Sequence, residues 1–121
     1  MKLGPLRLLA GAPSSAQLSP VVKFASPAPP RSTGLFHLAI LYPTRALLAD
    51  ALRRVLAANI PLDGASDHGV SEAIYLRDPD QNGVELYWDR PPQEWPRAAD
   101  AALAMYTRPL DLHDLLAELD R

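Results

Sequence analysis

Apolar residues are densest in residues 35–42, where β-forming side chains would occupy both faces of an extended chain. One imidazole, His37, interrupts the run, and Pro43 ends it because proline cannot donate a backbone hydrogen bond. A short apolar run bounded by such a breaker is typical of a strand with both faces covered. The pattern therefore predicts a buried strand over residues 35–42.

The next segment changes to helical periodicity. Leucine and valine recur at helical spacing through residues 45–58, Thr44 is placed to cap the first turn, and Pro61 prevents the helix from continuing. Residues 62–70 are rich in turn-forming residues, so they predict at most a short strand after the helix.

A tight hairpin is predicted after this turn-rich segment. Residues 72–77 are strand formers, residues 78–83 are the turn sequence Asp-Pro-Asp-Gln-Asn-Gly, and residues 84–88 form the returning strand. The predicted order is strand, helix, short strand, strand, hairpin turn and strand, within a module that spans residues 34–90.

The two flanks carry weaker patterns. Residues 1–33 form an N-terminal arm that ends in a proline-rich linker, and residues 91–121 open with a proline-rich loop. The weak elements are two candidate strands (residues 6–10 and 21–24), an alanine-rich candidate helix (residues 98–106) and a short amphipathic helix (residues 112–119).

Composition excludes several classes of function. The chain has 121 residues, and its 12 basic and 14 acidic residues give a net charge of -2, so we expect no nucleic-acid partner. It lacks cysteine, which rules out disulfides, thiolate metal sites and a cysteine nucleophile. No apolar run approaches the roughly 20 residues of a membrane span, and residues 1–10 make a poor signal peptide. We expect a cytoplasmic protein with no membrane partner.

Two polar side chains stand out within the predicted strands. His37 lies in the first apolar run, and Glu85 lies between Val84 and Leu86. Burying a carboxylate costs free energy unless it is paired or bound to a cation. One hypothesis is that both side chains share a divalent ion, for which imidazole and carboxylate are suitable ligands. The alternative stays open, with Glu85 in solvent and His37 a hydrogen-bonded core residue, because these two residues alone form no motif.

Two further residues are candidates for proton transfer or substrate contact. His68 lies in a polar loop beside Gly69, where it could close over a ligand or remain an exposed loop residue. Tyr75 would lie opposite Glu85, on the same face, if a five-residue loop joins the two hairpin strands. His113, in the last predicted helix, is expected to be a surface residue.

Three stretches resemble a known superfamily. Residues 34–43, Gly-Leu-Phe-His-Leu-Ala-Ile-Leu-Tyr-Pro, resemble the opening strand of a module in the vicinal oxygen chelate superfamily, which includes glyoxalase I, bleomycin-resistance proteins and extradiol dioxygenases. Residues 67–76, Asp-His-Gly-Val-Ser-Glu-Ala-Ile-Tyr-Leu, and residues 78–87, Asp-Pro-Asp-Gln-Asn-Gly-Val-Glu-Leu-Tyr, resemble its catechol-2,3-dioxygenase-like branch. The resemblance covers residues 30–92.

The resemblance implies an α+β fold: one complete βαβββ module, preceded by a truncated module and followed by a short C-terminal helical tail. It places His37 and Glu85 at metal-ligand positions, and His68 and Tyr75 where catalytic residues contact substrate and dioxygen. The implied cofactor is a divalent metal, Fe(II) or Mn(II), with Zn or Ni as alternatives. The implied substrate is a catechol or another small molecule with vicinal oxygens, into which dioxygen is inserted.

The chain departs from that family pattern in one respect. Relatives complete the metal site with a third protein ligand from a neighbouring module, usually a histidine, and no histidine precedes His37 here. Three outcomes stay open. The chain could form a homodimer that completes the site. The site could be a weak one with two ligands in a protein that is no longer an enzyme, including a non-catalytic protein that binds or sequesters a small molecule, as bleomycin-resistance proteins do. The chain could also be a degenerate fragment of a longer family member.

Overall fold

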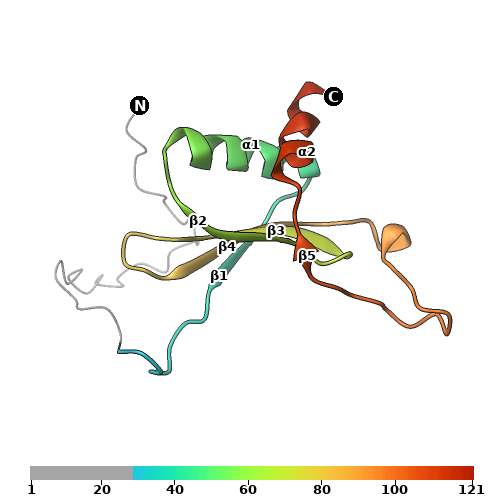
Figure 1. Ribbon diagram of the computed structural model, residues 1–121, viewed down its shortest axis with the longest axis horizontal. Coiled ribbons are helices and arrows are strands. Elements are labelled where there is room, and N and C mark those ends of the chain that lie inside the picture. Colours follow the sequence, from blue (N-terminus) through green and yellow to red (C-terminus); the bar gives the residue numbers. More distant parts are fainter. Residues whose placement is uncertain (1–28) are drawn as a thin grey trace, which may run out of the picture.

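The computed structural model describes residues 29–121 (Figure 1). The two candidate strands of the arm, residues 6–10 and 21–24, and most of the predicted truncated module lie outside these described residues. The elements, in chain order, are β1 (Leu38–Leu41), α1 (Arg45–Ala57), β2 (Leu62–Asp67), β3 (Ser71–Arg77), β4 (Gly83–Asp89), a 3-10 turn (Pro92–Glu94), β5 (Arg108–Pro109), α2 (Leu112–Ala117) and a second 3-10 turn (Glu118–Asp120).

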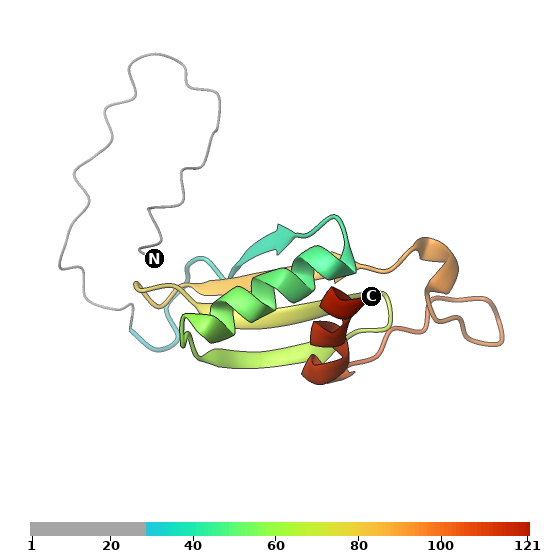
Figure 2. The same cartoon turned by 90° about the horizontal axis from the view of Figure 1, so that it is seen from above.

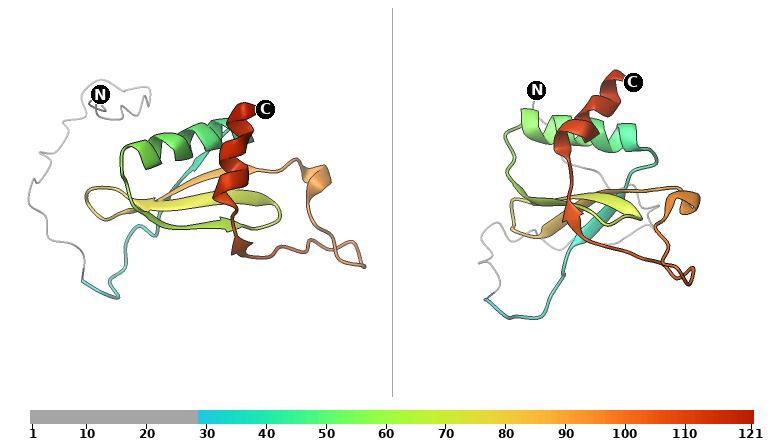
Figure 3. Two further views of the ribbon diagram at one scale, coloured as in Figure 1. Left: turned by 45° about the horizontal axis from the view of Figure 1, so that its top comes forward. Right: turned by 45° about the vertical axis from the view of Figure 1, so that its right-hand side comes forward.

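The strands form one mixed sheet in the order β1-β4-β3-β2-β5. β1 runs parallel to β4, and the other neighbouring pairs are antiparallel. Both α-helices lie on the same face of this sheet, and within the described residues no helix covers the opposite face (Figures 1, 2 and 3). The predicted α+β class is confirmed, and the arrangement is compatible with a βαβββ module. We call the uncovered face the open face.

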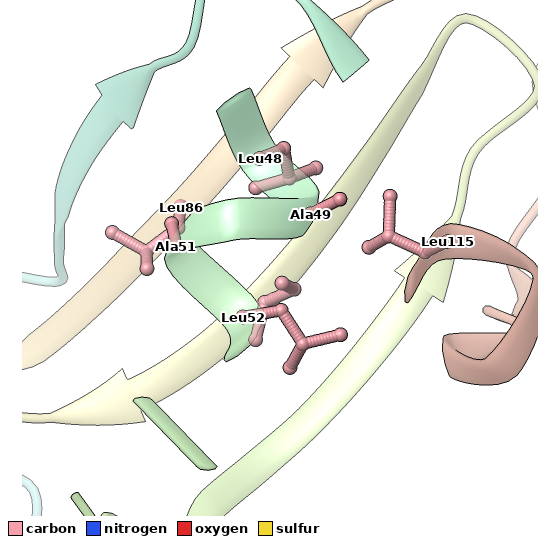
Figure 4. Close-up of a cluster of buried hydrophobic side chains, with 7 residues drawn as sticks. Leu48, Ala49, Ala51, Leu52, Leu86 and Leu115 are labelled. Carbon is pink, nitrogen blue, oxygen red and sulfur yellow. The ribbon is translucent and has the colours of Figure 1, made fainter. Parts of the chain in front are cut away.

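The hydrophobic core lies between the helices and the sheet. Helix α1 provides most of it, because its apolar stripe faces the strands, while α2 and the two central strands contribute single residues (Figure 4). The buried cluster comprises Leu48, Ala49, Ala51 and Leu52 of α1, Ile74 of β3, Leu86 of β4 and Leu115 of α2.

Helix α1 confirms the predicted span to within one residue at its C-terminal end. The Thr44 hydroxyl accepts a hydrogen bond from the backbone N–H of Leu47, as expected of an N-cap residue. Beyond the last turn, Asn59 adopts a left-handed conformation (φ 54°) that ends the helix, and Pro61 follows it. Local sequence signals therefore set both ends of this helix.

The prediction of a buried strand over residues 35–42 is wrong in extent and in burial. Only residues 38–41 form β1, and Leu38 and Leu41 remain 49% and 53% exposed. The preceding Leu35 and Phe36 are still more exposed. β1 is an edge strand that pairs only with β4, and α1 covers only one face of the sheet. A doubly apolar run shows what a strand could bury, but not whether a partner surface is present.

The alanine-rich helix predicted over residues 98–106 is also wrong. Its start is a turn closed by the Asp100 carboxylate, which accepts from the Ala102 N–H, and Ala101 has a left-handed conformation. Arg97 and Leu103 then form an isolated antiparallel bridge. A short alanine-rich stretch between two prolines is too short to keep a helix by propensity alone.

After residue 106 the chain forms one strand that was not predicted and one helix that was. The chain continues into β5, a two-residue strand that pairs with β2 and that the sequence did not predict. The final helix is confirmed: α2 is capped by Asp111, and the second 3-10 turn extends it. β2 is also longer than expected, with six residues where at most a short strand was predicted.

Candidate functional site

The strand register brings two of the predicted site residues together. Tyr75 of β3 pairs directly with Glu85 of β4, and Arg77 pairs with Gly83 across the five-residue turn, as predicted. Directly paired residues project from the same face of a sheet. Their neighbours Ile74 and Leu86 lie in the core, so alternation along the strands places Tyr75 and Glu85 on the open face.

His37, the residue directly before the edge strand β1, reaches the same carboxylate. Its Nε2 atom lies 2.9 Å from Oε2 of Glu85, and the two side chains are 30% and 17% exposed. Gly83 permits this approach: a Cβ atom there would lie 3.0 Å from the backbone oxygen of Phe36 and 3.2 Å from Cβ of His37. The glycine that ends the hairpin turn therefore leaves room for the start of β1.

Tyr75 contacts the other oxygen of the Glu85 carboxylate. Its hydroxyl donates a hydrogen bond to Oε1 of Glu85 over 3.3 Å. Partial burial raises the pKa of Tyr75, and the negative charge of Glu85 and the hydrogen bond to it raise that pKa further. The phenol therefore stays protonated at neutral pH and can act as a hydrogen-bond donor.

His68 completes a row of four side chains along the open face. Its Nε2 atom lies 3.1 Å from the Tyr75 hydroxyl. On the other side of the ring, Nδ1 lies 3.2 Å from the hydroxyl of Thr107 and 3.3 Å from the backbone oxygen of Tyr106. The row therefore runs His37, Glu85, Tyr75, His68. The predicted site residues lie together, and sequence reasoning missed the two residues that anchor His68.

The turn that carries His68 is packed, whereas the sequence suggested a loop able to close over a ligand. His68 and Ser71 form a backbone hydrogen bond across a short turn in which Gly69 has a φ of +77°. A Cβ atom on Gly69 would lie 2.7 Å from Cγ of Pro96 and 2.8 Å from Cε1 of Tyr106. Residues from the tail thus hold the β2–β3 turn in place.

A buried ion network on the helix side supports the same turn. The Glu72 carboxylate, 4% exposed, accepts from Arg45 Nε at 2.9 Å and from Arg90 Nη2 at 2.7 Å. Arg90 also forms a bidentate pair with Asp67, whose Oδ1 accepts from the Gly69 N–H. Charges so far apart in the chain follow no periodic pattern, which is why the sequence did not predict this network.

The Asp67 carboxylate is held in its charged form. Burial acts to raise the pKa of Asp67, but the hydrogen bonds from Arg90 and Gly69 and the charge of Arg90 lower it more. The net pKa therefore lies below the ordinary value for an aspartate. This pairing fixes the residue directly before His68.

The side chains of His37 and Glu85 supply an imidazole nitrogen and carboxylate oxygens, which are donor atoms that bind divalent cations. Nε2 of His37 and Oε2 of Glu85 lie 2.9 Å apart, which is the distance of a direct hydrogen bond between the two side chains. Residues 29–121 contain no group of three or more His, Cys, Asp or Glu side chains arranged to hold a metal. His113, exposed on α2 as expected, lies on the helix-covered side.

One hollow on the described surface lies beside the site rather than within it. It encloses about 740 Å³ between residues 32–36 and the hairpin turn, with Arg77 on its wall. The row of four side chains instead lies on the open face of the sheet.

None of the helices described here is long and apolar enough to cross a bilayer.

Two curated proteins with dioxygenase names match part of the chain. No protein-family profile matches the chain. Over 91 residues, 74% of this chain, it is 48% identical to catechol-2,3-dioxygenase from Bacillus subtilis (strain 168), covering 32% of that protein. Over 60 residues, 50% of this chain, it is 38% identical to biphenyl-2,3-diol 1,2-dioxygenase 3 from Rhodococcus globerulus, again covering 32%. The chain thus spans about a third of the length of the curated relatives it matches.

Proposed function

We propose that this chain is an extradiol dioxygenase of the vicinal oxygen chelate superfamily, acting on a catechol-type substrate with a divalent metal, Fe(II) or Mn(II). The observation that carries the proposal is the 2.9 Å approach of His37 to Glu85 at one end of a hydrogen-bonded row on the open face. Two relatives bear names for dioxygenases of catechol and of biphenyl-2,3-diol, which supports the choice of reaction.

In this proposal each residue of the row has a defined task. His37 and Glu85 would hold the metal, which when bound supplies Lewis acidity toward two vicinal oxygens and dioxygen. Tyr75, protonated at neutral pH, would donate a hydrogen bond to a substrate oxygen. His68, next in the row, would accept or return a proton, the role for which imidazole is suited near neutral pH.

A homodimer or a neighbouring module would supply the third metal ligand. Support comes from β1, an edge strand whose outer side has no partner strand among the described residues. The adjoining Leu35, Phe36 and Leu41 are between 53% and 88% exposed. Apolar side chains beside an unpaired strand edge favour association with another chain. Because specificity would depend on that second surface, the proposal assigns only the substrate class.

Metal binding and oxygen consumption of the full chain test the proposal together. We expect the wild-type chain, stripped of metal and reloaded anaerobically with Fe(II), to bind metal stoichiometrically and to consume oxygen when catechol is added. His37→Ala and Glu85→Gln should both abolish metal retention. His113→Ala and Glu94→Gln serve as matched controls, because each removes the same kind of group from an exposed position outside the row.

Solution mass distinguishes the remaining outcomes. A metal-loaded dimer with catechol-dependent oxygen uptake supports the proposal in full. A monomer that retains no metal contradicts it. Thermal stabilisation by a catechol that persists after chelation, and in Glu85→Gln, would instead identify a non-catalytic binding protein.

A further inference from the structure

Thr107 lies opposite His68 in a continuation of the β2–β5 ladder. Ser66 pairs with Pro109 and Asp67 with Arg108, so the next antiparallel position sets His68 against Thr107. The backbone extends the ladder there, since the Tyr106 N–H donates to the His68 carbonyl at 3.3 Å. Cross-strand neighbours share a face, which explains why the Thr107 hydroxyl reaches the His68 ring from the tail of the chain.

The hydrogen-bond contacts at His68 restrict where its proton can be. An ionised carboxylate only accepts hydrogen bonds, so the single hydroxyl proton of Tyr75 is directed to Glu85 over 3.3 Å. The Tyr75 oxygen is then an acceptor toward His68 Nε2 at 3.1 Å, which requires a proton on that nitrogen. In a neutral ring, Nδ1 is then unprotonated and must itself accept a hydrogen bond.

Only one of the two groups beside Nδ1 can donate to it. The Tyr106 carbonyl, 3.3 Å away, has no proton to give. The Thr107 hydroxyl, at 3.2 Å, can donate or accept. From this proton count we infer that Thr107 is a positioning residue, which donates its hydroxyl proton to Nδ1 and holds neutral His68 as the Nε2–H tautomer.

The tautomer of His68 sets the donor-to-acceptor direction of the hydrogen bonds along the row. With the proton on Nε2, hydrogen bonds run in one sense from Thr107 through His68 and Tyr75 to Glu85. With the proton on Nδ1, the ring would donate to the Tyr106 carbonyl, and Tyr75 would have to turn its proton away from Glu85. The use of this direction in catalysis rests on the proposed function, whereas the tautomer itself is a property of the metal-free chain.

Nitrogen-15 NMR of the imidazole rings tests the inference without metal or catechol. The full 121-residue chain is labelled and studied at about pH 8, where a histidine is ordinarily neutral, with His68 assigned by a His68→Asn variant. We expect wild-type His68 to show a protonated Nε2 and an unprotonated Nδ1. Thr107→Val keeps the shape but removes the donor, so the tautomer ratio should move about fivefold toward Nδ1–H. Thr107→Ser should restore the wild-type ratio.

Two results would overturn the inference: a wild-type ring protonated on Nδ1, or a ratio that Thr107→Val leaves unchanged while circular dichroism and the melting temperature match the wild type. Should the valine variant fold poorly, Thr107→Ala against Thr107→Ser gives the same comparison. Failure of oxygen uptake would contradict the proposed function and leave these spectra unaffected. An inverted tautomer in an active enzyme would contradict the role of Thr107 alone.

Discussion

Tyr75 and Glu85 are directly paired across β3 and β4, and the Tyr75 hydroxyl donates to the carboxylate oxygen that His37 does not contact. Glu85 is therefore contacted from both sides, by Tyr75 on β3 and by His37 directly before β1. Tyr75 could therefore have two roles, to orient the Glu85 carboxylate and to donate a hydrogen bond to a substrate. A single substitution at Tyr75 can distinguish them.

Tyr75→Phe should affect catalysis much more than stability or metal retention. Loss of one partly exposed hydrogen bond costs about 1 kcal/mol of unfolding free energy, whereas loss of a positioned proton donor costs about 10²-fold in rate. Oxygen uptake at saturating catechol and metal content after dialysis measure the two effects. Tyr87→Phe, two residues beyond Glu85 on the same strand, is the control. Equal losses of activity in both variants would contradict the assigned role.

Glu72 is expected to be the most sensitive charged residue for stability. Its carboxylate is almost fully buried between Arg45 and Arg90, so Glu72→Ala would remove the buried acceptor that the two guanidinium groups share. Arg90 would keep Asp67, and Arg45 would keep Asp114 and Glu118. Breaking such a buried network by removing one member costs about 3 kcal/mol. Urea unfolding followed by circular dichroism gives the value. Glu94→Ala, at an exposed position, should change the unfolding free energy by less than about 0.5 kcal/mol.

Acid should destabilise the fold partly through Asp67. Since its pKa is lower in the folded chain than in the unfolded chain, the stability it provides is complete above the unfolded value of about 3.9. That stability is lost as the pH falls through the lower folded value. The unfolding free energy should therefore decline below about pH 4, and less steeply in Asp67→Asn. Identical slopes for the wild type and Asp67→Asn would exclude Asp67 as a contributor.

Elements whose signals are local could be predicted from the sequence. The cap at Thr44 and the stop after Asn59 fix α1, and the turn sequence of residues 78–83 fixes the hairpin and with it the Tyr75–Glu85 pair. The joint placement of His37 and Glu85 depends on β1 lying beside β4. The sequence carried it only as the hypothesis that both side chains share one ion. The structure thus brings together the four residues that the sequence singled out.

Features that depend on distant contacts could not be predicted in this way. The exposure of β1 depends on which faces of the sheet are covered, and alanine propensity over residues 98–106 was outweighed by the turn at Asp100 and by pairing of β5 with β2. Thr107 reaches His68 through that same pairing. No spacing or composition signal in the chain indicates such a contact before the sheet order is known.

Gly69 should be required for the site although it carries no functional group. Its φ of +77° disfavours any side chain, and a Cβ atom would lie within 3.0 Å of Pro96 and Tyr106. Gly69→Ala must therefore shift the turn or the tail segment that anchors His68, at a cost of about 1–3 kcal/mol. Gly64→Ala is the matched control, because a Cβ atom there meets nothing within 4 Å. Urea unfolding should separate the two variants, and the His68 ring resonances should move only in the first. If the two alanine variants were equally stable, with unchanged His68 resonances, the packed turn would not be what positions this histidine.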